Sequence, residues 1–487
     1  MSFQCSNVNV LLAIVVYSNF LDYLLLTTVV PIIPQYLVEV DTEQALKEQE
    51  ENVTELFLNE TDVFIHINDS IIDINPADAK SERFLETILH IPVRAISENS
   101  KVGWLLGSKA IVQMVANPVV GFLSNRVSYR HLLLFGISVF LVSSAVFAAA
   151  ESYVLLLIAR ASQGIGSAAT LIAGMSMIAE NYLDDKERSR AMGIAMGGLS
   201  LGILVGYPFG GFMYAFCGKS VPFVVIGALC ALNIGLQIQC LDPDSGLNRV
   251  EMKSSSLIKL LVDPYIMICA GAIMVTSMSL AVLESTVPLW IIDTMKAKQW
   301  HLALIFLPDS IGYLIGTCCF AVIAKKYGRW IFTIGSLFSI GIGTLVIPFC
   351  RHLGHLLIPH LALGLGVGVT DAALVPLLAL LVDQRHISTY GSVYSIVQLA
   401  VCLAYSLGPA VAGNVVKAVG FEWSMWSIAI INLAYVPLCV FLKSPPVDNE
   451  TKGLLDEMAS PDDIKNDMNK QLYQTISTDH GKLINKQ

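Results

Sequence analysis

Long apolar runs separated by short polar stretches dominate the chain. Twelve of these runs reach the length of about 20 residues that an α-helix needs to cross a bilayer. Backbone N–H and C=O groups cannot stay unpaired in lipid, and the runs lack strand-like alternation, so helices are favoured over barrel strands. The predicted spans are residues 8–37, 102–124, 131–150, 153–179, 190–215, 221–241, 264–292, 302–324, 330–349, 355–382, 389–415 and 421–442.

The polar stretches between these runs predict the domain organisation. The segments are 1–38 (N-terminus and first helix), 39–100 (polar insert), 101–241 (five helices), 242–263 (longest remaining loop), 264–442 (six helices) and 443–487 (polar tail). A short basic turn follows the second helix of each half, at 121–129 and again at 321–329. The sequence therefore predicts an all-α membrane protein with twelve transmembrane helices in two six-helix pseudo-symmetric halves, a plan in which transporters bind substrate between the halves.

Composition supports this class and excludes others. Of the 487 residues, 54% are hydrophobic and 14% are charged, whereas a soluble domain has about 25% charged residues. A soluble enzyme and a nucleic-acid binder are therefore excluded as first interpretations. The ten cysteines lie mostly in apolar runs, and neither a His/Cys metal spacing nor a nucleophile–base arrangement occurs. We expect no enzymatic activity, no metal and no cofactor, and we expect the first run to be a retained helix in contact with membrane lipid.

The distribution of charge predicts the orientation of the chain. The net charge is −9, but the insert 39–100 alone holds 15 acidic and four basic residues. Among the short loops, twelve Lys and Arg residues lie on the side of the N-terminus and five lie on the other side. The positive-inside rule then predicts that both termini are cytoplasmic. The insert would face the lumen, where its sequons at Asn52, Asn59 and Asn68 predict glycosylation.

Ionisable side chains inside the predicted spans are candidates for function, because each costs about 3 kcal/mol or more at bilayer depth. Five stand out: Asp22, Lys109, Arg160, Glu284 and Asp371. Buried structural ion pairs are the alternative interpretation. A carboxylate in such a place binds either an ammonium group or a proton, and competition between the two is the simplest chemistry of an antiporter. Tyr313 and Tyr405 lie beside polar groups in the spans and are candidates to contact a ligand cation.

The polar tail carries a candidate sorting signal. Glu450 lies four residues before the pair Leu454-Leu455. An acid at this distance from two leucines is typical of signals that bind adaptor proteins, although such matches also occur by chance.

Several motifs resemble the vesicular amine transporters, a family within the major facilitator superfamily. The matching segments are Leu21–Pro34, Ser108-Lys109-Ala110 with Asn117-Pro118, Ile158–Gly166, Asp371 with Pro376, and Val382–Tyr394. The resemblance covers residues 1–445 approximately, and the run from His386 to Tyr394 is not general to the superfamily. It implies that the chain loads monoamines or acetylcholine into acidic secretory or synaptic vesicles in exchange for lumenal protons.

The resemblance also implies roles for individual residues. Asp22 would meet the substrate amine, and Glu284 and Asp371 would belong to the substrate and proton site. The residues implied in proton coupling and gating are Lys109, Arg160, Asp371, Gln398 and His386. The expected partners are a small cationic amine, protons, membrane lipid and, through the dileucine of the tail, adaptor proteins.

Three departures from the family pattern concern the substrate. Gln398 stands where the family has an acid paired with Lys109, Tyr23 stands where it has Asn, and Asp309 stands where a small neutral residue is expected. Lys109 could then be neutral, could pair with Asp22 or another acid, or could await a substrate carboxylate. The alternatives to a monoamine are therefore a zwitterion or other small solute, or acetylcholine. A transport-inactive receptor is less favoured, because it would not need the retained acids.

Overall fold

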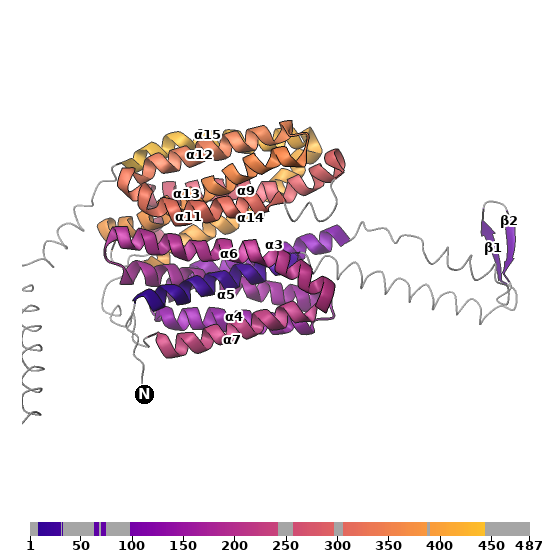
Figure 1. Ribbon diagram of the computed structural model, residues 1–487, viewed down its shortest axis with the longest axis horizontal. Helices are drawn as coiled ribbons and strands as arrows, with labels where there is room; N and C mark the ends of the chain where they lie inside the picture. Colours follow the sequence, from indigo (N-terminus) through magenta and orange to yellow (C-terminus); the bar gives the residue numbers. More distant parts are fainter. Residues whose placement is uncertain are drawn as a thin grey trace, which may run out of the picture.

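The computed structural model describes residues 8–30, 32, 63–67, 70–74, 98–241, 257–296, 305–386 and 390–443. Long helices run side by side through most of this part of the chain (Figure 1). Within the described residues, eleven helices are long and apolar enough to cross a membrane. The helix α3 (Glu98–Leu123) is a twelfth long helix beside them, so each of the twelve predicted spans contains a helix.

The helices form two halves that lie one above the other in Figure 1. The N-terminal half consists of the first helix (Val8–Val30), α3, α4 (Tyr129–Ala149), α5 (Tyr153–Asn181), α6 (Asp185–Cys217) and α7 (Ser220–Cys240). The C-terminal half consists of α9 (Pro264–Met295), α11 (Leu307–Tyr327), α12 (Arg329–Val346), η2 (Ile347–Phe349), α13 (Leu353–Arg385), α14 (Tyr390–Val419), α15 (Phe421–Cys439) and η3 (Val440–Lys443). A short helix, α8 (Leu257–Val262), precedes the second half.

The packing of the helices repeats from one half to the other. In the N-terminal half α5 packs against α3 and α4, and α4 also packs against α7. In the C-terminal half α13 packs against α11 and α12 in the same way, and α12 packs against α15. The two halves meet through α3 with α14 and through α6 with α11, which are equivalent pairs under this correspondence. The predicted pseudo-symmetric halves are thus seen as two copies of one packing pattern.

The first residues of two helices depend on nearby side chains and not on the apolar pattern. The helix α6 begins at Asp185, five residues before the predicted span, because the Asp184 side chain accepts hydrogen bonds from the backbone N–H groups of Lys186 and Glu187. The helix α11 begins at Leu307 rather than at 302, with Pro308 in its first turn. The apolar pattern marks the membrane-crossing part of a helix and does not detect such ends.

A short β-hairpin accompanies the helical membrane fold and was not predicted. The strands β1 (Val63–Ile67) and β2 (Ser70–Ile74) pair antiparallel within the polar insert, with Val63 opposite Ile74. Both strands are rich in Ile and Val, which favour extended backbone. They are too short to form apolar runs of membrane-crossing length, so the hydrophobic pattern does not predict them.

Ion pairs join the two halves at one end of the bundle. The guanidinium of Arg188 on α6 lies 2.7 Å from the carboxylate of Asp383 on α13. Asp185 on α6 binds Arg329 at 2.7 Å and Lys325 at 3.2 Å. We call this the basic end: it is the end at which α6 begins and α13 ends. Among the described residues, every ion pair that joins the halves lies there.

Candidate functional site

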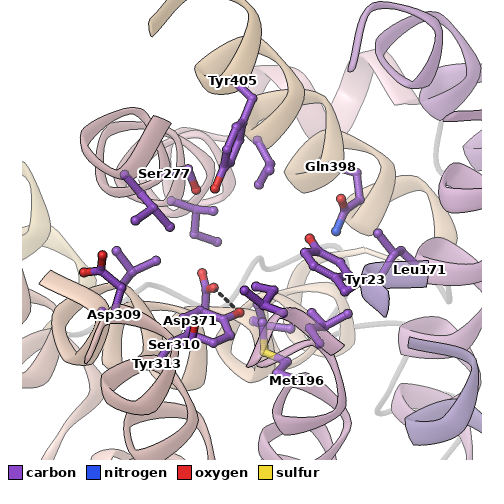
Figure 2. Close-up of a pocket in the computed structure, with 18 of the residues that line it drawn as sticks. Tyr23, Leu171, Met196, Ser277, Asp309, Ser310, Tyr313, Asp371, Gln398 and Tyr405 are labelled. Carbon is purple, nitrogen blue, oxygen red and sulfur yellow. Dashed lines mark hydrogen bonds between the residues drawn. The ribbon is translucent and has the colours of Figure 1, made fainter. Parts of the chain in front are cut away.

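A cavity lies between the two halves, lined by the first helix, α5 and α6 on one side and by α9, α11, α13 and α14 on the other (Figure 2). It contains about 1070 Å³ of empty space, including its open mouth. Its lining is mostly apolar and aromatic with a few polar groups, which is typical of sites for small organic ligands. The predicted position of a site between the halves therefore coincides with a real cavity.

The charged side chains that line the cavity are all acidic and all belong to the C-terminal half. They are Glu284 on α9, Asp309 on α11 and Asp371 on α13. Among the described lining residues there is no Lys, Arg or His. The wall contributed by the N-terminal half is apolar or aromatic, with Tyr23 and Met196 as examples (Figure 2). A cavity with this lining favours a positively charged ligand.

The carboxyl group of Asp371 is oriented by a tyrosine. The hydroxyl of Tyr313 donates a hydrogen bond to Oδ2 of Asp371 at 2.9 Å, drawn as the dashed line in Figure 2. The two residues come from the tightly packed pair α11 and α13. Only 8% of the Asp371 surface is exposed. One oxygen is thus fixed by the protein, and the group as a whole faces the cavity.

Glu284 differs from Asp371 because no hydrogen bond or ion pair holds its carboxyl group among the described residues. Its side chain lines the cavity from α9, and Tyr405 and Gln398 line it from α14. In Figure 2 the hydroxyl of Tyr405 points into the cavity and the amide of Gln398 points toward Tyr23. A carboxyl without a protein partner is available to a ligand or a proton.

Aromatic rings form a large part of the lining. They are Tyr23, Tyr207, Phe306, Tyr313, Tyr394 and Tyr405. The face of such a ring attracts a ligand cation by about 0.5–2 kcal/mol. Rings and carboxylates together therefore select for an organic cation over a hydrated metal ion.

Asp22 and Lys109 form an ion pair behind the wall of the cavity. The Lys109 ammonium lies 3.4 Å from Oδ1 of Asp22 and 5.6 Å from the centre of the Tyr23 ring. Ser167 donates a hydrogen bond to the same oxygen of Asp22 at 2.6 Å. Asp22 is fully buried and is not one of the residues that line the cavity. Adjacent residues of the first helix thus face different ways, with Tyr23 toward the cavity and Asp22 toward α3 and α5.

Arg160 lies deeper in the same polar network. Its guanidinium donates hydrogen bonds to the side chain of Gln163 at 2.8 Å and to the backbone carbonyl of Leu26 at 3.3 Å. The amide of Gln163 in turn donates to the backbone carbonyl of Asp22 at 3.4 Å. These contacts tie α5 to the first helix, so Arg160 fixes the helix that carries Asp22 and does not line the cavity.

His386 lies at the basic end, away from the cavity. Its ring is 3.0 Å from Oδ2 of Asp263, which also accepts a hydrogen bond from Arg385 at 2.7 Å. Asp263 caps α9 by accepting from the backbone N–H of Tyr265. Burial raises the pKa of Asp263, but the hydrogen bonds from His386, Arg385 and Tyr265 outweigh this effect and lower the pKa to about 2. The cluster joins the start of α9 to the end of α13.

The structure thus divides the residues predicted for the site into three groups. Glu284, Asp371, Tyr313, Tyr405 and Gln398 line the cavity; Asp22, Lys109 and Arg160 lie in the network behind it; and His386 lies at the basic end. The predicted glycosylation and sorting residues Asn52, Asn59, Asn68, Glu450, Leu454 and Leu455 lie outside the described residues.

Three further residues were not assigned to the site by the sequence analysis. Tyr207 and Asp309 line the cavity, and His360 binds Asp309 from α13. Asp309 was noted only as a departure from the family pattern. His360 and Asp309 could have been found as a second set of titratable residues inside apolar runs, but their pairing depends on how α11 meets α13.

Comparison with known proteins supports these observations. The family model of the Major Facilitator Superfamily matches residues 15–398 and 310–466. The chain is 40% identical to the synaptic vesicular amine transporter of Rattus norvegicus, over 93% of this chain and 91% of that protein. It is 43% identical to the chromaffin granule amine transporter of Homo sapiens, over 74% of this chain and 68% of that protein. It is 35% identical to the vesicular acetylcholine transporter of Torpedo marmorata, over 92% and 85%.

A solved structure shows the same fold at low sequence identity. The human organic anion transporter MFSD10 (TETRAN) superposes with a TM-score of 0.68 and 16% identity, over 88% of this chain and 99% of that chain. The protein is therefore a multi-pass membrane transporter rather than an enzyme. Its fold, its cavity between two halves and these relatives together show that the chain belongs to the major facilitator superfamily and, within it, to the family of the vesicular amine transporters.

Proposed function

We propose that this protein is a proton-coupled antiporter that loads a cationic amine from the cytoplasm into acidic secretory or synaptic vesicles. The observation that carries the proposal is the lining of the cavity, which holds three carboxyl groups, six aromatic rings and, among the described residues, no basic side chain. The named relatives are amine and acetylcholine transporters, which agrees with a cationic substrate.

Exchange of a proton for an amine follows from the chemistry of Asp371 and Glu284. A carboxylate removed from water needs a positive partner, and the described residues supply Asp371 with one neutral hydrogen bond and no cation. An ammonium group and a proton both meet this need, and they exclude one another. Binding of a proton from the acidic lumen would then release the amine, and loss of that proton to the cytoplasm would restore the site.

The ion pairs at the basic end suit one state of an alternating-access cycle. In this proposal the basic end faces the cytoplasm, as the excess of Lys and Arg predicts, and the insert 39–100, with its predicted glycosylation sites, faces the lumen. The pair Arg188–Asp383 and the contacts of Asp185 then close the cytoplasmic side. The cycle must break these contacts to admit substrate. His386 and Asp263 lie close to the end of α13, which carries Asp383 and would separate from α6.

The contacts of Lys109 favour an amine over a zwitterion. A substrate carboxylate would be required if Lys109 had no partner, but Asp22 lies 3.4 Å from it. Acetylcholine remains an alternative cation, since aromatic faces bind quaternary ammonium groups well. A transport-inactive receptor is the remaining alternative, and it predicts no uptake of any substrate.

Uptake into acidified membrane vesicles that contain the full chain tests the proposal. Labelled serotonin, acetylcholine and amino acids would be compared with and without an ionophore that collapses the proton gradient. We expect serotonin uptake that the ionophore abolishes, and no amino-acid uptake. Asp371→Asn should reduce uptake to background, whereas Asp293→Asn, at an exposed position near the end of α9, should not. Uptake that survives the ionophore would refute proton coupling, and uptake of amino acids alone would refute the amine.

A further inference from the structure

A buried pair of titratable residues lies at one side of the cavity, and the exchange described above for Asp371 and Glu284 does not assign it a task of its own. Oδ2 of Asp309 on α11 is 2.6 Å from Nδ1 of His360 on α13. His360 is fully buried, and the Asp309 side chain is 7% exposed. Asp309 nevertheless lines the cavity, on the opposite side from Gln398 (Figure 2).

The two helices hold this pair in a fixed position. Asp309 lies in the first turn of α11, where an acid is favoured by the helix dipole. Gly364, one turn beyond His360 on α13, contacts the Asp309 backbone so closely that a Cβ atom would collide with the Asp309 carbonyl. The edge of the His360 ring meets the Phe306 ring, with centroids 5.7 Å apart. Neither side chain can turn away without breaking this packing.

The hydrogen bonds of the pair indicate which group carries charge. Nε2 of His360 is buried and has no hydrogen-bond partner among the described residues. A protonated ring would leave a charged N–H unpaired at that position, which is costly. We therefore assign a neutral ring that donates from Nδ1 to Asp309. Asp309 then has no cationic partner among the described residues, so its carboxyl group, like that of Asp371, meets its need for positive charge with a proton or with a ligand ammonium group.

We propose that Asp309 is a second cation subsite, and that the preferred substrate is an amine that carries a second positive charge at its far end. The proposal rests on the proposed function and refines its substrate class. Asp371 would bind one ammonium group and Asp309 the other, with His360 acting as a positioning residue for Asp309.

The positions of Asp309 and Asp371 along α11 and α13 allow one short ligand to contact both carboxyl groups. Asp309 and Tyr313 are four residues apart on α11, which is about 6 Å of helix, and Tyr313 binds Asp371. On α13, His360 and Asp371 are 11 residues apart, which is about 16 Å. The length spanned by an extended five-carbon diamine, with a hydrogen bond of about 2.8 Å at each end, lies between these two helix rises.

Competition between two alkylamines of equal length tests the inference. Cadaverine has an ammonium group at each end, and pentylamine has one. Their binding to the purified full chain would be measured by thermal stabilisation, and their inhibition of serotonin uptake would be measured in acidified vesicles. We expect cadaverine to act at a concentration at least about tenfold lower than pentylamine. Asp309→Asn should bring the two concentrations within about twofold, and Asp309→Glu, which keeps the charge, should retain most of the preference.

The outcomes separate this inference from the proposed function. Equal affinities of cadaverine and pentylamine for the wild-type chain would overturn the inference, whether or not any variant folds. So would a preference that Asp309→Asn leaves unchanged. Serotonin uptake that is absent, or that resists the ionophore, would count against the proposed function alone, because the binding measurement needs no transport. Asp293→Asn is the matched control and should leave the ratio of affinities as in the wild type.

Discussion

The ammonium nitrogen of Lys109 lies 3.4 Å from Oδ1 of Asp22, and this is the only ion pair that either residue forms among the described residues. The pair joins α3 to the first helix inside the N-terminal half and does not bridge the halves. It compensates Lys109 although Gln398 replaces the acid of the family pattern. Two predictions follow from the location of this pair, one on stability and one on selectivity.

Removing one member of the pair should harm the protein more than removing both. Asp22→Asn leaves a buried cation unpaired, which costs about 3–5 kcal/mol. The double variant Asp22→Asn with Lys109→Met removes both charges and should recover at least about 1 kcal/mol of this loss. Thermal unfolding of the purified single and double variants measures the coupling. Strictly additive effects of the two substitutions would show that the ion pair makes no contribution to stability.

Adding an acid at Gln398 should change substrate selectivity little. Because Asp22 already compensates Lys109, the Gln398→Asp variant has no unpaired cation to neutralise. We expect the ratio of serotonin uptake to zwitterion uptake to change less than about threefold, where pairing of a free ammonium would change it more than about tenfold. Side-by-side uptake by the wild type and the variant decides between these results. A large gain of serotonin uptake would mean that Lys109 lacks a sufficient partner during transport.

Fixing the basic end in its closed arrangement should stop transport. The Asn125 amide on the N-terminal half donates to the Ser392 hydroxyl on the C-terminal half at 3.0 Å. A short bifunctional thiol reagent should therefore link the double variant Asn125→Cys with Ser392→Cys and reduce uptake to background. Treatment with a reductant should restore uptake.

Each single cysteine variant is the control for this experiment, because it reacts with the reagent and cannot form the link. The wild-type chain controls for its own cysteines, of which Cys217, Cys318 and Cys319 are exposed. Linked protein that still transports at the normal rate would contradict a cycle in which the basic end opens.

Loss of Asp263 should destabilise the protein at both ends of the physiological pH range. A group whose pKa is lowered on folding adds stability above its unfolded pKa, near 4, and loses it as the pH falls through its folded pKa. Since the folded pKa of Asp263 is about 2, its carboxylate contributes fully at both pH 5.5 and pH 7.5, roughly the lumenal and cytoplasmic extremes. Asp263→Asn should lower stability by about 1–3 kcal/mol at both values.

Thermal unfolding at the two pH values checks this prediction. Asp184→Asn is a suitable comparison, because Asp184 also caps a helix but is exposed and pairs with backbone N–H groups alone among the described residues. Destabilisation by Asp263→Asn at pH 7.5 that disappears at pH 5.5 would show that the Asp263 carboxyl titrates within this range.

The sequence predicted the helices of the fold well because one physical requirement determines them. Every predicted span needs about 20 apolar residues, and the structure has a long helix in each. The ends were less predictable, as at α6, where the side chain of Asp184 and a charged first turn extend the helix beyond the apolar run. The hairpin of β1 and β2 was missed because its strands depend on pairing with each other and not on burial in lipid.

The site was predicted in part for a similar reason. Glu284 and Asp371 stand out as isolated acids in apolar runs, and both line the cavity. Asp22 looks the same in the sequence but faces α3 and α5, since the direction of a side chain depends on the rotation of its helix against its neighbours. The pairing of Asp309 with His360 depends on the contact between α11 and α13, which residue types alone do not specify.

The confinement of the lining acids to the C-terminal half has a mechanical consequence. Glu284, Asp309 and Asp371 belong to one packed unit of helices, and the opposite wall offers rings and methyl groups. A cation bound by these acids would move together with the C-terminal half while the N-terminal half moves relative to it. In the proposed cycle the amine would keep the same acidic partners while the two halves move against each other. Its electrostatic energy would therefore change little during that motion. In the proposed antiport cycle, protonation of these acids would then be the step that releases the amine.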